Sequence, residues 1–276
     1  MNDYTPDRNA PIGVFDSGVG GLTVMREILR NLPKEKIIYF GDTARVPYGS
    51  KSKETVVRYS EQILRFLEKQ QVKAIVIACN TASALALDSL EKETNLPIIG
   101  VVRPGARVAA ATTKNGRIGV IATESTISSN LYPEYIRAVR PDITVFGKAC
   151  PLFVSLVEEG WTDDPITEMV ARRYLDELLE KDIDTLIMGC THYPLLRTLL
   201  RRIVGDRVEL INPAYETAIA LKQMLEEMDL QRLETPPAEG QYRFYTSDAA
   251  ERFNSFADSI LPCTVADTKQ IRIEDF

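Results

Sequence analysis

The sequence contains no long apolar segment. A transmembrane helix needs about 20 consecutive apolar residues, and LPIIGVV is among the longest apolar runs here. The first ten residues, MNDYTPDRNA, also lack the apolar core of a signal peptide. We therefore expect a cytoplasmic protein with no membrane association, in which residues 1–10 form a flexible tail.

Positive charge is scarce as well. The 276 residues include 33 Lys and Arg against 39 Asp and Glu, which gives a formal net charge of −6. A protein whose main partner is nucleic acid needs a basic face that neutralises phosphates, so we expect no nucleic-acid partner. Hydrophobic residues at 45% and charged residues at 26% are typical of a globular protein. The length provides enough core for two modest domains or one large one.

Cysteine and histidine are few. The four cysteines form neither a CxxC pair nor a dense framework, so we expect reduced thiols rather than disulfides. The only histidine is His192, two residues after Cys190. Together with Cys79 they supply three possible zinc ligands, but the close-paired cysteines of a typical zinc site are missing. We expect no metal and keep zinc as the less favoured alternative.

Short apolar runs alternate with amphipathic segments along the chain. The runs PIGVF, KIIYFG, AIVIAC and LPIIGV are rich in β-branched residues, as strands are. Between them lie helical patterns such as ETVVRYSEQILRFLEKQ, where Val56, Ile63, Leu64 and Leu67 form one apolar stripe. Strands that are apolar on both faces and joined by helices form parallel sheets. The sequence therefore predicts an α/β fold.

The chain also repeats itself. The segment IGVFDS at 12–17 aligns with IGVIAT at 118–123, an offset of 106 residues, and Phe-Gly at 40–41 aligns with Phe-Gly at 146–147 at the same offset. The segment AIVIACNT then aligns with TLIMGCTH at an offset of 111. Sequence repeats indicate repeated structural units. We expect two similar domains, each a mainly parallel sheet flanked by helices, related by pseudo-two-fold symmetry with the site between them.

The predicted first domain consists of residues 1–100 and 214–276, and the second of residues 101–213. After the second half, the sequence reads as a helix, the Pro-rich break TPPAEG, a strand QYRFYTS, another helix and a last extended stretch. We expect these C-terminal elements to return to the first half.

Polar and thiol side chains follow the predicted strands. In an open parallel sheet, ligands bind beyond the carboxyl ends of the strands. The residues at these ends are Asp16, Ser17, the turn at 47–50, Cys79, Asn80, Thr81, Thr123, Cys150, Cys190, Thr191 and His192. If the two halves face each other, Cys79 and Cys190 approach one cleft from opposite sides.

The position of each thiol suggests its chemistry. A cysteine between a strand and a helix lies near the partial positive charge of the helix N-terminus, which favours the thiolate. A thiolate can remove a proton from carbon, while a thiol on the opposite side returns one. Acid and base groups that oppose each other across one carbon invert its configuration. The two thiols then exchange roles for the reverse reaction.

Other interpretations of these residues stay open. A free cysteine is often a buried small hydrophobe, which is the interpretation we favour for Cys263. Asn80, Thr81 and Thr191 suit helix caps, and Asp16 suits a cap for the helix that follows it. A lone histidine is often structural. The glycine-rich DSGVGG could cradle a phosphate, although it matches neither GxGxxG nor a Walker loop.

Five segments together resemble one family. They are GVFDSGVGGLTV at 13–24, YFGDTARVPYGSKS at 39–52, IACNTAS at 77–83, CPLFVSLVEEG at 150–160 and GCTHYPLL at 189–196. They are similar to the cofactor-independent glutamate racemases within the aspartate/glutamate racemase group. The resemblance implies interconversion of L- and D-glutamate by two acid/base thiols, supply of D-glutamate for bacterial peptidoglycan, and a homodimer.

The resemblance also implies roles for single residues. Cys79 and Cys190 match the two acid/base thiols. Asp16 matches the carboxylate that assists the first thiol, while His192 and Glu158 match groups that assist the second. The positions that line the substrate match Asp16, Ser17, Tyr48, Gly49, Asn80, Thr81, Thr123, Thr126, Thr191 and His192. Ala122 departs from the glycine that the family often has before the first of these second-half threonines.

Two other functions fit parts of the sequence. The same scaffold could racemise aspartate or another α-substituted acid, which relative kcat/KM values across amino acids would distinguish. A two-lobed binding module without chemistry belongs to a different class and is opposed by the paired thiols. Pyridoxal phosphate needs a Schiff-base lysine, and no lysine stands at the strand-end motifs, so we expect no cofactor.

Overall fold

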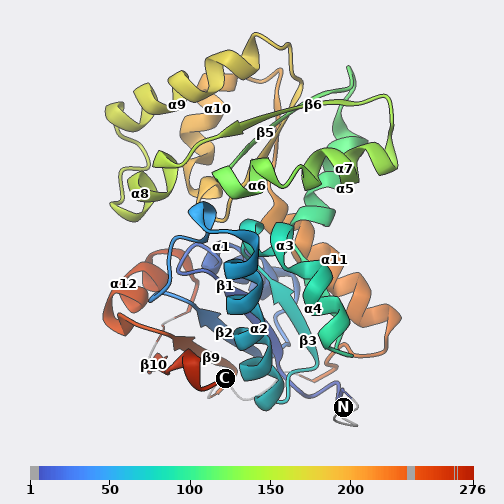
Figure 1. Ribbon diagram of the computed structural model, residues 1–276, viewed down its shortest axis with the longest axis vertical. Coiled ribbons are helices and arrows are strands. Elements are labelled where there is room, and N and C mark those ends of the chain that lie inside the picture. Colours follow the sequence, from blue (N-terminus) through green and yellow to red (C-terminus); the bar gives the residue numbers. More distant parts are fainter. Residues whose placement is uncertain (1–5, 235–239, 264, 266) are drawn as a thin grey trace.

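The strands of the protein form two separate parallel sheets, and helices flank both of them (Figure 1). The computed structural model describes residues 6–234, 240–263, 265 and 267–276. In Figure 1 the larger sheet lies in the lower half of the molecule and the smaller sheet in the upper half. None of the described helices is long and apolar enough to cross a membrane. The predicted α/β class with two sheets flanked by helices is confirmed.

The larger sheet has the strand order β10-β9-β2-β1-β3-β4, and all neighbouring strands are parallel. Its strands are β1 (Ile12–Asp16), β2 (Ile37–Gly41), β3 (Ala74–Ile77), β4 (Ile98–Gly100), β9 (Tyr242–Thr246) and β10 (Lys269–Gln270). Every residue of β1, β2 and β3 is buried. Because both faces are covered, these strands read as continuous apolar runs.

Helices cover both faces of this larger sheet. Successive strand residues point to opposite faces, so Val14 belongs to the core formed with α1, α11 and α12, whereas Phe15 belongs to the core formed with α2. The α2 stripe predicted from the sequence is buried as expected. The elements are α1 (Leu22–Asn31), η1 (Tyr48–Ser50), α2 (Lys53–Lys69), α3 (Asn80–Leu85), α4 (Leu87–Glu93), α11 (Pro213–Glu227), α12 (Ala250–Ile260) and η3 (Ile273–Asp275).

The smaller sheet has the order β6-β5-β7-β8 and is also parallel. Its strands are β5 (Arg117–Ala122), β6 (Thr144–Ala149), β7 (Thr185–Gly189) and β8 (Glu209–Ile211). The helices of this half are α5 (Val102–Thr112), α6 (Glu124–Ser128), α7 (Leu131–Val139), α8 (Leu152–Glu158), α9 (Pro165–Leu179), η2 (Tyr193–Leu196) and α10 (Arg197–Val204). Asp164 caps α9, accepting a hydrogen bond from the Ile166 N–H.

The order of strands supports the repeat seen in the sequence. The order β2-β1-β3-β4 in one sheet corresponds to β6-β5-β7-β8 in the other. Phe15 pairs with Ile77, and Ile121 pairs with Met188, as the offsets of 106 and 111 require.

One part of the predicted alignment is wrong. Phe15 pairs with Phe40, but Ile121 pairs with Lys148 rather than with Phe146. The second Phe-Gly dipeptide therefore lies two residues earlier along its strand than the first. Register in a parallel ladder is set by the pairing of whole strands, so the shared dipeptide is a coincidence of composition.

The C-terminal elements lie against the first half. Strand β9 pairs with β2, and β10 pairs with β9. Helix α11 packs against α1 of the first half and also against α5 of the second half. Because α11 and α5 contact elements of both halves, the boundaries near residues 100 and 213 stay a prediction.

A buried ion pair holds the segment before β1. The Lys73 ammonium is fully buried and lies 2.6 Å from Glu35 Oε2, and it donates to the carbonyl oxygens of Arg8 and Leu230 at 2.7 Å each. The Arg232 guanidinium also donates to the Asn9 carbonyl. The segment around Arg8 and Asn9 is therefore anchored, which differs from the predicted flexible tail. Residues 1–5 of that tail, and residues 235–239 of the predicted Pro-rich break, lie outside the described residues.

Candidate active site

The carboxyl ends of the central strands from both halves meet at one place. The Thr81 hydroxyl after β3 lies 2.9 Å from the Thr123 hydroxyl after β5. On the other side, the Thr23 hydroxyl donates to the Thr191 carbonyl at 2.8 Å. A Cβ at Gly20 would lie 2.4 Å from Thr191 Oγ1, so the close approach of the halves requires glycine there. The predicted strand-end residues are thus brought together from two sheets.

Cys79 occupies the N-cap of α3, two residues after the last residue of β3. Its sulfur accepts a hydrogen bond from the Ala82 N–H at 3.4 Å and hydrogen-bonds with the Ser17 hydroxyl at 3.5 Å. Burial and the charge of Asp16 raise the pKa of the Cys79 thiol to about 12, outweighing these hydrogen bonds, and the charge of Cys190 adds to the rise. The Ala82 N–H at the helix N-terminus does favour the thiolate as expected, but desolvation of the charged form is the larger effect and favours the thiol.

Asp16 is the last residue of β1 and is fully buried. Its Oδ2 accepts a hydrogen bond from the Gly18 N–H at 2.9 Å, while Oδ1 has no partner among the described residues. Burial raises the pKa of this carboxyl, although the positive charge of His192 and backbone N–H groups oppose the rise. The alternative that Asp16 caps the following helix is wrong, since Gly21 is the N-cap of α1 and no side chain caps it.

Cys190 begins a chain of three side chains in the second half. Its sulfur lies 3.8 Å from His192 Nδ1, and His192 Nε2 lies 3.1 Å from Glu158 Oε1. Burial lowers the pKa of His192, but its hydrogen bonds to Cys190 and Glu158 and the nearby negative charges outweigh burial and raise the pKa to about 10. The hydrogen bond to His192 holds the pKa of Glu158 below its usual value despite partial burial. His192 is therefore positively charged at neutral pH.

Hydroxyl groups from both halves form a cluster at the start of α3, the helix that Cys79 caps. Thr81 lies within hydrogen-bond distance of both Thr123 and Thr126, whose hydroxyls are 3.0 Å apart. Thr123 also caps α6 through the Thr126 N–H. The Tyr132 hydroxyl donates to Asn80 Oδ1 at 2.7 Å and fixes that amide. Capping uses only a lone pair of the hydroxyl oxygen, so the hydrogen bond that the hydroxyl donates can still be transferred from a neighbouring threonine to a ligand.

The turn containing Tyr48 and Gly49 reaches the second half, but not through the tyrosine ring. The Tyr48 hydroxyl is buried and donates to Asp42. Only the backbone of Tyr48 is left to face a ligand. A Cβ at Gly49 would lie 2.7 Å from Thr123 Cβ, and the Ser125 hydroxyl donates to the Gly49 carbonyl at 2.8 Å. The turn is thus fixed between the halves.

Three residues that the sequence analysis did not assign support these groups. Asp42 is fully buried and accepts from Arg45 Nε at 2.7 Å and from the Ser247 hydroxyl at 2.8 Å, besides the tyrosine of the turn. Tyr132 and Arg252 contact assigned residues from outside the motifs. Asp42 follows β2 directly, so the rule that ligand-facing residues follow strands would have identified it.

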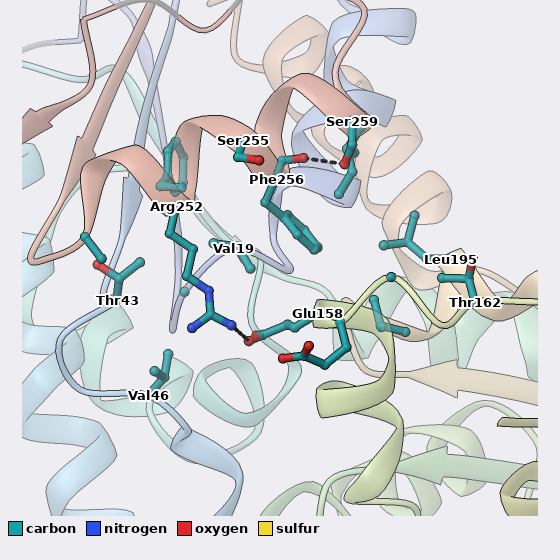
Figure 2. A pocket seen from close by; sticks show the side chains of 17 residues that line it. Val19, Thr43, Val46, Glu158, Thr162, Leu195, Arg252, Ser255, Phe256 and Ser259 are labelled. Atoms are coloured by element: carbon teal, nitrogen blue, oxygen red, sulfur yellow. Dashed lines mark hydrogen bonds and ion pairs between the residues drawn. The ribbon is translucent and has the colours of Figure 1, made fainter. Parts of the chain in front are cut away.

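A cavity of about 560 Å³ lies on the outer side of Glu158, between α12, the end of α8 and the loop after β1 (Figure 2). Glu158 and Arg252 line it, but neither Cys79 nor Cys190 does. Both thiols are almost fully buried. The cavity is therefore not the predicted cleft between the thiols. Among the described residues, no group of three His, Cys, Asp or Glu side chains is arranged to hold a metal ion.

Comparisons with known proteins agree with this arrangement. Residues 12–221 match the family model described as Asp/Glu/Hydantoin racemase. The chain is 48% identical over 264 residues to a protein of Geobacter metallireducens named glutamate racemase, covering 95% of this chain and 97% of that one. It is 45% identical to the Syntrophus aciditrophicus protein of the same name, covering 99% and 100%.

Solved structures are similar as well. The glutamate racemase of Francisella tularensis in complex with D-glutamate has a TM-score of 0.90 at 39% identity, covering 98% of this chain and all of that chain. The Thermus thermophilus enzyme in complex with β-chloro-D-alanine has a TM-score of 0.88 at 42% identity, with coverage of 98% and 100%. The chain therefore belongs to the Asp/Glu/Hydantoin racemase family, which confirms the predicted amino-acid racemase and its resemblance to the glutamate racemases.

Proposed function

We propose that the protein interconverts L- and D-glutamate by moving a proton on and off the α-carbon between the thiols of Cys79 and Cys190. The observation that carries this proposal is the placement of the two thiols. Each follows the corresponding strand of one half, β3 or β7, and the two are close enough for the charge of one to affect the other. Relatives named glutamate racemase that cover nearly the whole chain support glutamate as substrate.

In the proposed reaction, one sulfur acts as a thiolate and takes the α-proton, leaving the C–H electron pair on carbon. The other sulfur, as a thiol, then gives its proton to the opposite face of that carbon. The product has the inverted configuration, and the two sulfurs have exchanged protonation states. Reversal needs only the opposite starting states.

Each thiol has its own assisting group in this proposal. His192 carries positive charge at neutral pH and stabilises a thiolate at Cys190, while Glu158 holds the imidazole in place. Cys79 is held as a thiol by burial, so it begins as the acid. When Cys79 must act as the base, Asp16 is the carboxylate that accepts its proton, since the pKa of Asp16 is raised.

The substrate's charged groups need partners within the cleft. We assign its carboxylates to neutral donors, namely the hydroxyl cluster and backbone N–H groups of the strand-end turns. The ammonium group is assigned to the unpartnered Oδ1 of Asp16 and to Asn80. The residues proposed to contact substrate are Asp16, Ser17, Tyr48, Gly49, Asn80, Thr81, Thr123, Thr126, Thr191 and His192.

The test follows isotope uptake from deuterated water. Either enantiomer should gain one α-deuterium as it racemises, and kcat/KM should be higher for glutamate than for aspartate, whose shorter chain leaves polar groups unpaired. Cys79→Ala and Cys190→Ala should each abolish interconversion, because the loss of either sulfur stops the transfer halfway. Cys263→Ala, which removes a half-buried thiol elsewhere, should racemise like the wild type. Full turnover in either of the first two variants, or tight glutamate binding without racemisation by the wild type, contradicts the proposal.

The proposal extends to the cellular role and the assembly that the resemblance implies. A cytoplasmic enzyme of this kind supplies D-glutamate for peptidoglycan, so the gene should restore growth of a bacterium that otherwise requires added D-glutamate. Light scattering should give the mass of two chains. If the bacterium still requires D-glutamate although the enzyme is active, the proposed cellular role is wrong. If light scattering gives the mass of one chain, the proposed homodimer is wrong.

A further inference from the structure

Helix α12, in the C-terminal part of the chain, packs with the first half and forms one wall of the cavity next to Glu158. The end of α8, in the second half, forms the opposite wall. Figure 2 shows the Arg252 side chain leaving α12 and extending across the cavity toward Glu158. This is a contact between the halves that no sequence motif indicated.

The two oxygens of Glu158 have different partners. Oε1 lies 3.1 Å from His192 Nε2, whereas Oε2 lies 3.5 Å from Arg252 Nη2. One turn further along α12, the Phe256 ring centroid lies 6.4 Å from that of His192. Residues at positions i and i+4 share one face of a helix, so this face of α12 meets both the imidazole and the carboxylate that holds it.

The Arg252–Glu158 pair adds little to stability. The arginine side chain is 71% exposed, and exposed ion pairs stabilise proteins weakly. The carboxylate itself is 29% exposed and has room to rotate toward the cavity. A guanidinium on its outer oxygen restricts that rotation, because a charge-assisted hydrogen bond has a preferred geometry.

We propose that Arg252 is a positioning residue of the racemase site: it holds the outer oxygen of Glu158 so that the inner oxygen stays on His192. This inference rests on the proposed function, in which His192 assists Cys190. Through Glu158 and His192, the packing of α12 then affects the proposed acid/base role of Cys190.

The charged groups around His192 allow two modes of action to be separated. Cys190 lies on its own segment, Asp16 comes from β1 and Glu158 from α8, while Arg252 comes from α12, and Glu159 lines the same cavity. If Arg252 positions Glu158, its removal weakens the bond to the imidazole and lowers the pKa of His192. If Arg252 acted only by its charge, its removal would raise that pKa.

His192 is the only histidine, so one imidazole signal reports this difference directly. The pKa of His192, followed by NMR titration, should be lower in Arg252→Ala than in the wild type. In Arg252→Lys it should lie between these two values. In a Glu158→Gln background the same arginine replacement should give no downward shift. A shift to higher pH, or no shift in the Glu158-containing protein, overturns the proposal.

Kinetics provide the second measurement. Arg252→Ala should lower kcat/KM for glutamate about two- to fivefold, the range of an exposed pair, and equally for both enantiomers because the equilibrium constant of a racemisation is one. Arg243→Ala, which removes an exposed arginine from β9, should match the wild type. In the Glu158→Gln background, loss of Arg252 should cost nothing further. Additive losses overturn the proposal.

The two proposals fail in distinguishable ways. If the wild-type protein has no racemase activity, the proposed function is wrong, but the imidazole titration still tests the Arg252 contact. If the wild type is active and Arg252→Ala changes neither kcat/KM nor the titration of His192, only the proposed role of Arg252 is wrong. Equal melting temperatures of wild type and variant exclude a folding effect.

Discussion

At the scale of single residues, the two thiols are similar in sequence and different in surroundings. Cys79 has Ser17 and the N-terminus of α3 beside it, and burial keeps it protonated. Cys190 faces a charged imidazole instead. The pair was predictable because both thiols end an apolar strand run. The pKa direction at Cys79 was not, because it depends on how completely the thiol is buried, and a local motif does not reveal burial.

The charge on His192 makes a prediction about stability. Its pKa is about 10 in the folded protein against about 6.5 in an unfolded chain. The folded state holds the proton more tightly, so the stabilisation is complete below about pH 6.5 and is lost as the pH rises through about 10. Urea unfolding of wild type and His192→Gln should therefore show a difference in free energy of unfolding that shrinks over this range. A constant difference across it contradicts the assignment.

At the scale of secondary-structure elements, the strands were more predictable than their contacts. Period and composition are local signals, so β1, β2, β3 and β4 and the helix α2 followed from the sequence. The pairing of Asp42 with Ser247, 205 residues apart, depends on where β9 joins the sheet. The register of β6 likewise depends on the whole ladder. Such long-range relations leave no periodic pattern.

The turn at 47–50 depends on Asp42. Asp42→Ala should leave the Arg45 guanidinium, which is mostly buried, without its carboxylate and lower the free energy of unfolding by about 3–5 kcal/mol. It should also raise KM for glutamate, because Tyr48 and Gly49 lose their anchor. Ser247→Ala removes two hydrogen bonds of the hydroxyl group, one donated to Asp42 and one accepted from the Ala44 N–H, and should cost less, about 2 kcal/mol. Equal effects of the two replacements in denaturant titrations would show that Asp42 does not organise the turn.

At the scale of the whole molecule, the two halves approach each other through small residues. Gly20→Ala would place a methyl group 2.4 Å from Thr191 and 2.5 Å from His192. We expect a large loss of kcat, because the halves cannot close to the same separation, with a small change in melting temperature. Gly147→Ala adds a methyl group whose nearest neighbour is the Ile127 side chain at 3.2 Å, and it should retain activity. Similar kcat values for the two variants would contradict this account of closure.

The hydroxyls of Thr81, Thr123 and Thr126 satisfy one another across the boundary between the halves. A carboxylate that arrives must take over those same hydrogens, so each ligand bond replaces a protein bond instead of adding to the total. The affinity for such a ligand then depends on the difference between the hydrogen bonds that it forms and the threonine hydrogen bonds that it replaces. If the proposed function is right, binding of substrate should therefore leave the two halves joined through its carboxylate where the threonine hydroxyls joined them before.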